Sequence, residues 1–393
     1  MKNRIGSSFL LIASSLFIHV PTSNAAPLVS IGDNADVFFN GSSSVLYSSN
    51  VLRDNDDELD DLWLSLTPGL ELNIGRGLSN LDLSVITRYE IRRYADLDDL
   101  DTELFSVEFD GAYRSSRLDV TGSAYFRESK GSSGDVNILD DLIESDNMGG
   151  DINAEYRFSP KFSFGAGFRY AETEYKTYTD FLADRERFDI PTDIFYELTP
   201  KVDLSLGYTY SESEVESLPA IFPRPAQQAF TTEDHFFNVG ARGNLLPKLT
   251  GFFKVGYRVR DDDRAGTDET SMLGMDADLT WATTPKLTNR LGLSRDFGVS
   301  GDGFSSENTS VSVTSNYSIN SYFAASAFGE YTLREFIEQD IEDDQYRLGL
   351  RLNYTPNEFW QFSAGYTYTE NDTDDDRRSF EDHTLDLTAS LRY

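Results

Sequence analysis

The sequence contains no cysteine, and it is poor in basic residues, with 34 Lys and Arg against 67 Asp and Glu. Without cysteine the chain cannot carry the lipid anchor of a bacterial lipoprotein, and it cannot be a disulfide-stabilised scaffold. The formal net charge of −33 argues against nucleic acid or an anionic lipid surface as a partner. We therefore expect no nucleic acid partner.

Long apolar runs are also missing. Hydrophobic residues make up 39% of the chain, and beyond residue 25 no run approaches the 18 apolar residues that a helical membrane span needs. Aromatic residues are nevertheless frequent at 13%, and 28 glycines are scattered along the chain. This composition is typical of transmembrane β-strands, in which only every second residue meets lipid. A soluble β-sandwich or β-helix is the alternative, and we favour the barrel.

The first 25 residues have the features of a secretory signal peptide. Lys2 and Arg4 form a positive start, residues 9–20 form a short apolar stretch, and small residues precede Ala25. We predict cleavage after Ala25, which would remove two positive side chains and take the net charge from −33 to −35. Residues 1–25 are thus predicted to be a cleaved signal peptide, and residues 26–393 a single outer-membrane barrel domain.

Short turn sequences recur through the rest of the chain, every 35 to 47 residues, and four of the eight contain Pro-Lys. The Pro-Lys turns lie at 159–161, 199–201, 246–248 and 284–286, and the others lie at 76–79, 114–117, 320–321 and 355–357. Segments of alternating apolar and polar residues flank each turn, and a longer acidic loop lies between successive turns. This regular succession predicts an up-and-down antiparallel β-barrel that crosses an outer membrane.

Eighteen strands can be placed around these turns. The predicted strands are 35–48, 59–73, 80–94, 102–113, 117–128, 148–158, 161–176, 187–198, 201–214, 232–245, 248–261, 270–282, 286–298, 306–318, 321–336, 343–354, 358–371 and 381–393. Strand 201–214 shows the pattern, with Val202, Leu204 and Leu206 on one face and Asp203 and Ser205 on the other. One face of such a strand meets hydrocarbon while the other stays in water, and the sheet must close because lipid-exposed edges are not tolerated.

The two ends of the predicted barrel differ in charge. The short turns carry Lys or Arg and almost no acid, whereas the long loops contain acidic runs such as 54–58 and 372–376. Short turns belong to the periplasm and long loops to the exterior, so an even number of strands places both termini in the periplasm. Tyr393, a terminal aromatic residue on an alternating strand, is the predicted signal for the barrel-assembly machinery. Tyr366, Tyr368 and Trp360 fit the aromatic girdles found at membrane interfaces.

Eighteen strands enclose more space than their own side chains fill, which predicts an aqueous lumen. Charged residues of the polar strand faces are the candidates for its lining: Arg88, Arg92, Arg169, Arg242, Lys254, Arg258, Arg260, Asp276, Asp278, Arg347 and Arg351. The basic residues of strands 232–245 and 248–261 could form a charged track that orients an anionic or hydroxyl-rich solute. They could equally form cross-strand ion pairs that stiffen the wall, and this second interpretation is favoured for any single residue.

The loop at about 215–231 is apolar and rich in proline, which is unusual on an acidic surface. Its candidates for a constriction are Pro219, Phe222, Pro223, Arg224 and Pro225. The loop could fold inward as a constriction or plug, or it could form a stiff external knob. The acidic loops elsewhere could bind divalent cations, but a solvated charged face is the simpler interpretation.

Nothing in the sequence supports catalysis. His235 and His383 are the only histidines after residue 25, and no Ser-His-acid set or phosphate-binding glycine loop is recognisable around them. We expect no enzymatic activity, no cofactor and no metal site.

Two segments near the N-terminus carry a family resemblance. Residues 49–53 (Ser-Asn-Val-Leu-Arg) are followed by an acidic stretch and then by residues 63–72, which contain Thr-Pro-Gly-Leu. Together with the Gly-Tyr-Thr-Tyr strands at 207–210 and 365–368, they resemble the putative β-barrel porin 2 family. The resemblance implies an outer-membrane barrel, and several such barrels accompany capsule or exopolysaccharide synthesis. It supplies no catalytic or binding residues.

Two classes of function remain open on the sequence. The first is a channel, most simply for polysaccharide export, with a general or solute-specific diffusion porin as the alternative. The second is a non-transporting structural or adhesive surface barrel. The expected partners are outer-membrane lipid and lipopolysaccharide, the barrel-assembly machinery and periplasmic polysaccharide-export components.

Overall fold

A computed structural model describes residues 27–75, 80–132, 141–221, 226–264, 267–337, 339, 341–374 and 378–393. The predicted signal peptide and the predicted turn at 76–79 lie outside these residues. The described chain is almost entirely β-structure, with one short 3₁₀ helix, η1 (Asp98–Leu100). Within the described residues, no helix combines the length and the apolar character of a membrane span.

The described residues form nineteen strands. They are β1 (Val29–Ile31), β2 (Ala35–Ser48), β3 (Asp61–Ile74), β4 (Leu81–Tyr94), β5 (Thr102–Arg114), β6 (Leu118–Gly131), β7 (Ile143–Arg157), β8 (Phe162–Tyr175), β9 (Arg185–Thr199), β10 (Val202–Val215), β11 (Phe230–Leu246), β12 (Leu249–Asp262), β13 (Thr270–Trp281), β14 (Leu287–Val299), β15 (Ser305–Ser318), β16 (Phe323–Phe336), β17 (Glu342–Tyr354), β18 (Trp360–Thr373) and β19 (Phe380–Arg392). Each strand from β2 to β19 pairs antiparallel with its neighbours in sequence.

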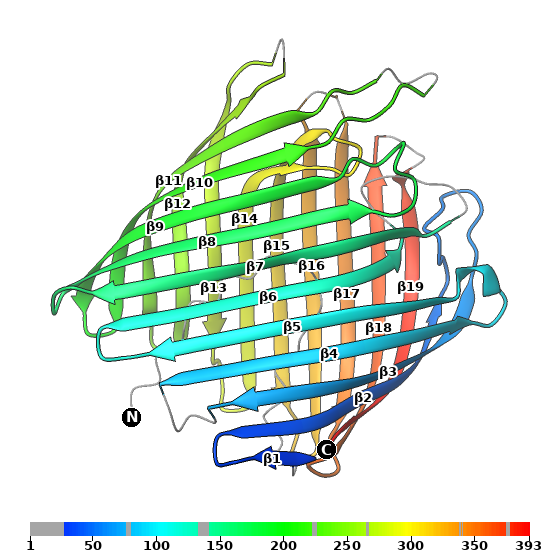
Figure 1. Ribbon diagram of the computed structural model, residues 1–393, viewed down its shortest axis with the longest axis horizontal. Coiled ribbons are helices and arrows are strands. Elements are labelled where there is room, and N and C mark those ends of the chain that lie inside the picture. The colour runs from blue at the N-terminus through cyan, green and yellow to red at the C-terminus, as the bar shows by residue number, and fades with distance from the viewer. Residues whose placement is uncertain are drawn as a thin grey trace.

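Strands β2 to β19 close into an eighteen-stranded barrel because β19 also pairs with β2, from Thr384↔Ser48 to Arg392↔Asn40. The last residue continues this seam, since the amide of Tyr393 donates to the carbonyl of Phe39 at 2.8 Å, and the carbonyl of Tyr393 accepts from the amide of Phe39 at 2.6 Å. In Figure 1 the strands at the front and those behind run in crossing directions, as tilted strands do in a barrel seen from the side.

The eighteen predicted strands are confirmed, with small shifts at their ends. The largest shift is at β7, which begins at Ile143 instead of residue 148 because residues 143–147 pair with the end of β6. Strand β1 was not predicted. It pairs with Ala35–Val37 and continues along the edge of β2 beyond the last residues of β19 (Figure 1).

The outward faces of the strands carry the apolar residues. Leu206, Leu350 and Leu387 are each more than 60% exposed, which for leucine fits contact with lipid and not with water. Trp360 and Tyr366 are also exposed on this outer face.

Clusters of buried apolar residues lie instead at the loop end of the barrel. One contains Val51, Tyr94, Leu100 and Leu142, and it joins three different loops. The long loops therefore pack against one another at the loop end of the barrel.

Candidate channel lining

All eleven residues predicted to line the lumen lie on the inward face of the barrel. On β17, for example, Arg351 stands between Leu350 and Leu352, whose exposed side chains mark the outer face. The inward face can be followed from strand to strand around the barrel, because paired residues of neighbouring strands point to the same side.

Three basic residues on β11 and β12, Arg242, Lys254 and Arg260, are held by carboxylates from other strands. The Lys254 ammonium group lies 2.9 Å from both carboxylate oxygens of Asp193 on β9, and both side chains are about 90% buried. The Arg260 guanidinium binds both oxygens of Asp234 at 2.6 and 2.7 Å, and these side chains are almost completely buried. In such surroundings each charge depends on its partner.

Arg242 connects strands that are well separated in the wall. It donates to both carboxylate oxygens of Glu155 on β7, at 2.7 and 2.8 Å, and to Asp203 on β10 at 3.1 Å. Its guanidinium carbon lies 3.4 Å from the centre of the Phe195 ring, so a cation–π contact adds to the ion pairs. Glycine at position 165 on β8 leaves room for this ring, because a Cβ atom there would lie 3.0 Å from it.

The remaining predicted charges mostly have partners too. The pairs that the described residues form are Arg88 with Glu108, Arg92 with Glu90, Arg169 with Asp189, Asp278 with Arg290, and Arg351 with Asp386. Most of these partners were missed on the sequence, although their strand parity also places them on the inward face. The alternation could have identified them as lumenal, but not the partner that each one binds.

Arg258 and Arg347 differ from the other predicted cations, because neither forms an ion pair with the described residues. Each lies over an aromatic ring, with Arg258 at 3.9 Å from the centre of Phe236 and Arg347 at 5.6 Å from that of Phe328. Asp276 faces Lys254 across the β12–β13 pair, and Lys254 binds Asp193 on β9.

A second part of the lumenal wall carries hydroxyl and amide groups in place of charges. The inward residues of β15 include Ser306, Asn308, Ser310, Ser312, Thr314 and Asn316. Ser310 hydrogen-bonds Thr332 on β16 at 3.0 Å. This wall offers neutral donors and acceptors to a solute in the lumen.

The proline-rich loop between β10 and β11 is described only in part. Pro219 is exposed, and Phe222, Pro223, Arg224 and Pro225 lie outside the described residues. The two ends of the loop are joined at Leu218 and Gln227, which exchange backbone hydrogen bonds of 2.9 Å. Whether the four central residues narrow the lumen stays a prediction.

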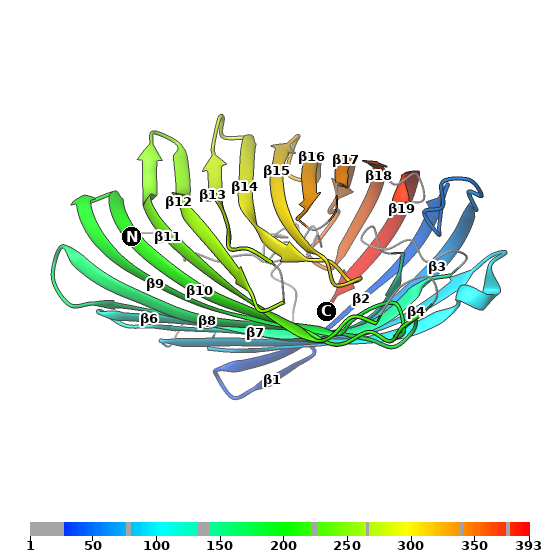
Figure 2. The same ribbon diagram turned by 90° about the horizontal axis from the view of Figure 1, so that it is seen from above.

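The end of the β14–β15 hairpin turns away from the wall into the barrel. Figure 2 shows this hairpin, in yellow, reaching across the ring of strands toward the green loops of the opposite wall. Phe297 is only 2% exposed and lies below the Arg260 guanidinium, although its position along β14 would place it on the outer face. This inward element was not predicted from the sequence.

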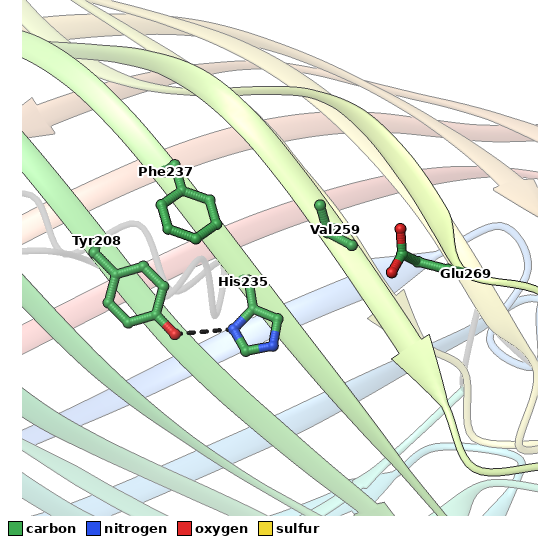
Figure 3. Close-up of a pocket in the computed structure, with 5 residues that line it drawn as sticks. All are labelled: Tyr208, His235, Phe237, Val259 and Glu269. Carbon is green, nitrogen blue, oxygen red and sulfur yellow. Dashed lines mark hydrogen bonds between the residues drawn. The ribbon is translucent and has the colours of Figure 1, made fainter.

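The cavity drawn in Figure 3 has a volume of about 540 Å³ and lies on the outer surface of the barrel. Tyr208, His235, Phe237 and Val259 line it from outward positions, together with Glu269 just before β13, and Phe237 is 56% exposed. The Tyr208 hydroxyl and His235 Nδ1 are 2.9 Å apart. The cavity therefore faces the membrane and does not belong to the lumen.

His383 repeats this arrangement on β19, with its Nδ1 2.8 Å from the Tyr366 hydroxyl. Both histidines that the structure describes thus lie beside tyrosine hydroxyls on the outer face. The described part of the chain contains no group of three or more His, Cys, Asp or Glu residues that could hold a metal ion.

The C-terminal part of the chain, residues 231–393, matches the family model described as "Putative beta-barrel porin 2". The matching family is the one that the sequence resembles, and the matched range includes the motif at 365–368, whereas the motifs at 49–53 and 63–72 lie outside it. No curated protein matches the chain. A closed barrel with an apolar outer face, together with this match, points to an integral outer-membrane β-barrel of the porin type.

Solved outer-membrane proteins show a distant likeness. OpdK from Pseudomonas aeruginosa, in a structure with vanillate, is 12% identical with a TM-score of 0.45, over 91% of this chain and 99% of that one. OccAB4 from Acinetobacter baumannii is also 12% identical, with a TM-score of 0.45 over 92% and 99% of the two chains. The copper transporter OprC is 10% identical, with a TM-score of 0.46 over 93% and 82%.

Proposed function

We propose that this integral outer-membrane barrel, whose residues 231–393 match a porin family, is a non-enzymatic channel. It would export a hydroxyl-rich polysaccharide across the outer membrane. The observation that carries the proposal is the pairing of lumenal charges. Lys254, Arg260 and Arg242 are each bound to carboxylates, so that their charges are largely neutralised.

A wall of paired charges presents hydrogen-bonding groups with little net field. Carboxylate oxygens and guanidinium N–H groups can exchange hydrogen bonds with hydroxyl groups, and the hydroxyl and amide side chains of β15 can do the same. A simple ion meets no strong attraction along such a wall. A sugar chain, which is neutral or weakly charged and carries many hydroxyl groups, fits these surroundings better.

We infer outward transport from the family resemblance, because several barrels of the putative β-barrel porin 2 family accompany polysaccharide synthesis systems. It implies periplasmic export components as partners at the short-turn end, where we place both termini. Lipopolysaccharide and the barrel-assembly machinery complete the proposed set of partners.

Deleting the gene and measuring surface polysaccharide tests the proposal directly. We expect the polysaccharide to disappear from the cell surface and to return with the wild-type chain. Retention of normal surface polysaccharide in the deletion strain would leave a diffusion porin or a structural barrel as the function.

Two neighbouring residues of β15 supply a matched pair of variants for the same assay. Thr314 points into the lumen, whereas Val313 is 44% exposed on the outer face. Thr314→Trp should lower both polysaccharide export and single-channel conductance in planar bilayers, and Val313→Trp should change neither. Equal effects of the two substitutions would show that the lumen is not the transport path.

A further inference from the structure

The hydrogen-bonded ladder between β13 and β14 covers only part of these strands. It runs from Trp281↔Asn289 to Met275↔Arg295 and ends there. Strand β13 continues for five more residues, Thr270 to Gly274, which pair with β12 but have no strand partner on their other side among the described residues. An unpaired strand edge at the membrane is costly, because lipid offers no hydrogen bonds to its backbone.

The segment that would continue this ladder is bound inside the barrel instead. The carbonyl oxygen of Gly298 accepts a hydrogen bond of 2.9 Å from Arg260, and that of Val299 accepts one of 2.7 Å from Arg185. Phe297 packs below Arg260, with its ring centre 4.8 Å from the guanidinium carbon. These contacts fix the upper part of β14 against the inner surface of β9 and β12.

The tip of the hairpin is held by two other loops. The amide of Ala183 donates to the carbonyl of Gly301 at 2.9 Å, so the tip is joined to the loop between β8 and β9. Val299 packs against the buried cluster of Ala183, Val215, Leu218 and Phe230, which includes the ends of the proline-rich loop. The hairpin therefore reaches the lumenal side of the opposite loops (Figure 2).

The sequence of this segment is also that of an ordinary wall strand. Phe297 and Val299 continue the outward series of Leu291 and Leu293, and Asp296 and Gly298 continue the inward series. Extending the existing register by two residues would place Phe297 opposite Leu273, which is 53% exposed on the outer face. The same residues can thus complete the wall, with apolar side chains toward lipid.

We propose that the end of the β14–β15 hairpin, residues 296–304, is a gate with two positions. In the folded position, which the structure shows, the hairpin occupies the loop end of the lumen. In the wall position β14 pairs with residues 270–274 of β13, and the lumen is wide enough for a polymer. The inference rests on the proposed channel function and adds to it the element that controls passage.

Because the chain contains no cysteine, engineered disulfides can test the two positions in the full-length protein in outer membranes. Leu273→Cys with Phe297→Cys reports the wall position. Met275→Cys with Arg295→Cys is the matched control, since this pair lies two residues further along the same ladder and has the same pairing geometry. Ala183→Cys with Gly301→Cys reports the folded position.

We expect all three pairs to form disulfides under mild oxidation, with the 273–297 pair slower than the control. Cross-linking is read from gel mobility and mass spectrometry, so it does not depend on transport. A 273–297 pair that stays reduced after the control pair is fully oxidised would overturn the proposal, because the hairpin would then be fixed.

Single-channel conductance then links position to passage. The 183–301 disulfide should lower the conductance and the 273–297 disulfide should raise it, and both changes should reverse with reductant. Cross-linking at both pairs without a change in conductance would overturn the gate. If no variant conducts at all, the channel function fails, while the cross-links still decide whether the hairpin moves.

Discussion

At the scale of single residues, the lumenal wall depends on charges whose partners come from distant strands. Lys254 on β12 reaches Asp193 on β9, and Arg242 on β11 reaches Glu155 on β7. Removing one member of a buried pair leaves the other charge without compensation, and this costs more than removing both. The wall should therefore tolerate paired replacements better than single ones.

The Lys254–Asp193 pair allows this to be measured. Lys254→Met leaves a buried carboxylate alone, and we expect it to destabilise the folded barrel by about 3 kcal/mol. The double variant Lys254→Met with Asp193→Leu should recover most of this loss. Unfolding by urea in detergent micelles, followed by the loss of the folded band on gels, gives both values. A double variant as unstable as the single one would contradict the argument.

A substitution at Gly256 can test how closely the backbones of β11 and β12 approach each other. A Cβ atom at this position would lie 1.9 Å from the carbonyl oxygen of Phe237, which belongs to the backbone of β11 and cannot move alone. Gly256→Ala should therefore separate β11 from β12 and cost about 1–3 kcal/mol, the range of other overpacked sites. Gly329→Ala is the control, since its Cβ would meet only the flexible end of Leu348 at 3.2 Å. Equal unfolding midpoints in urea for the two variants would refute this explanation.

At the scale of elements, the strands could be predicted and the path of one hairpin could not. Alternation and turn residues place all eighteen barrel strands because lipid on one side and water on the other force a period of two. Residues 296–299 have the same alternation whether β14 stays in the wall or folds inward. What holds them inside is a set of contacts with Arg260, Arg185 and Ala183, which are distant in sequence.

The candidate site shows the same limit. The inward side of Arg88 or Arg351 follows from strand parity alone, so the sequence could place the predicted lining residues. Their partners depend on how far a side chain reaches around the barrel. Lys254 binds Asp193 three strands away, although Asp276 is its cross-strand neighbour, and no local pattern encodes that reach.

The seam between β19 and β2 leads to a prediction at this scale. Deleting Tyr393 removes two backbone hydrogen bonds to Phe39 but leaves the nine-residue ladder from Thr384 to Arg392. Refolding into detergent should therefore change little. Insertion of the barrel into the outer membrane of cells should fall severalfold if the assembly machinery recognises the terminal aromatic residue. Tyr322→Ser, which removes an exposed aromatic side chain beside the short turn at 320–321, is the control. It should leave both refolding in detergent and insertion in cells unaffected. A similar loss in detergent and in cells would assign Tyr393 a purely structural role.

At the scale of the whole molecule, charge is distributed unevenly between the lumen and the long loops. The lumenal charges are largely paired, whereas the acidic loops account for much of the net charge of −33. Ion selectivity should therefore arise at the mouth of the channel and not along its wall.

Salt dependence separates these two origins. The Debye length is about 10 Å at 0.1 M salt and about 3 Å at 1 M, so the field of the exposed loops is screened at the higher concentration, while that of charges along a narrow lumen is screened much less. Reversal potentials in planar bilayers should accordingly show a preference for cations in dilute KCl that almost disappears in concentrated KCl. Replacing Asp56, Asp57 and Glu58 by their amides should weaken the preference in dilute KCl, since all three are exposed in the loop between β2 and β3. A cation preference that persists in concentrated KCl would mean that unpaired lumenal carboxylates select the ions, and the case for a sugar-conducting wall of neutralised charges would fail with it.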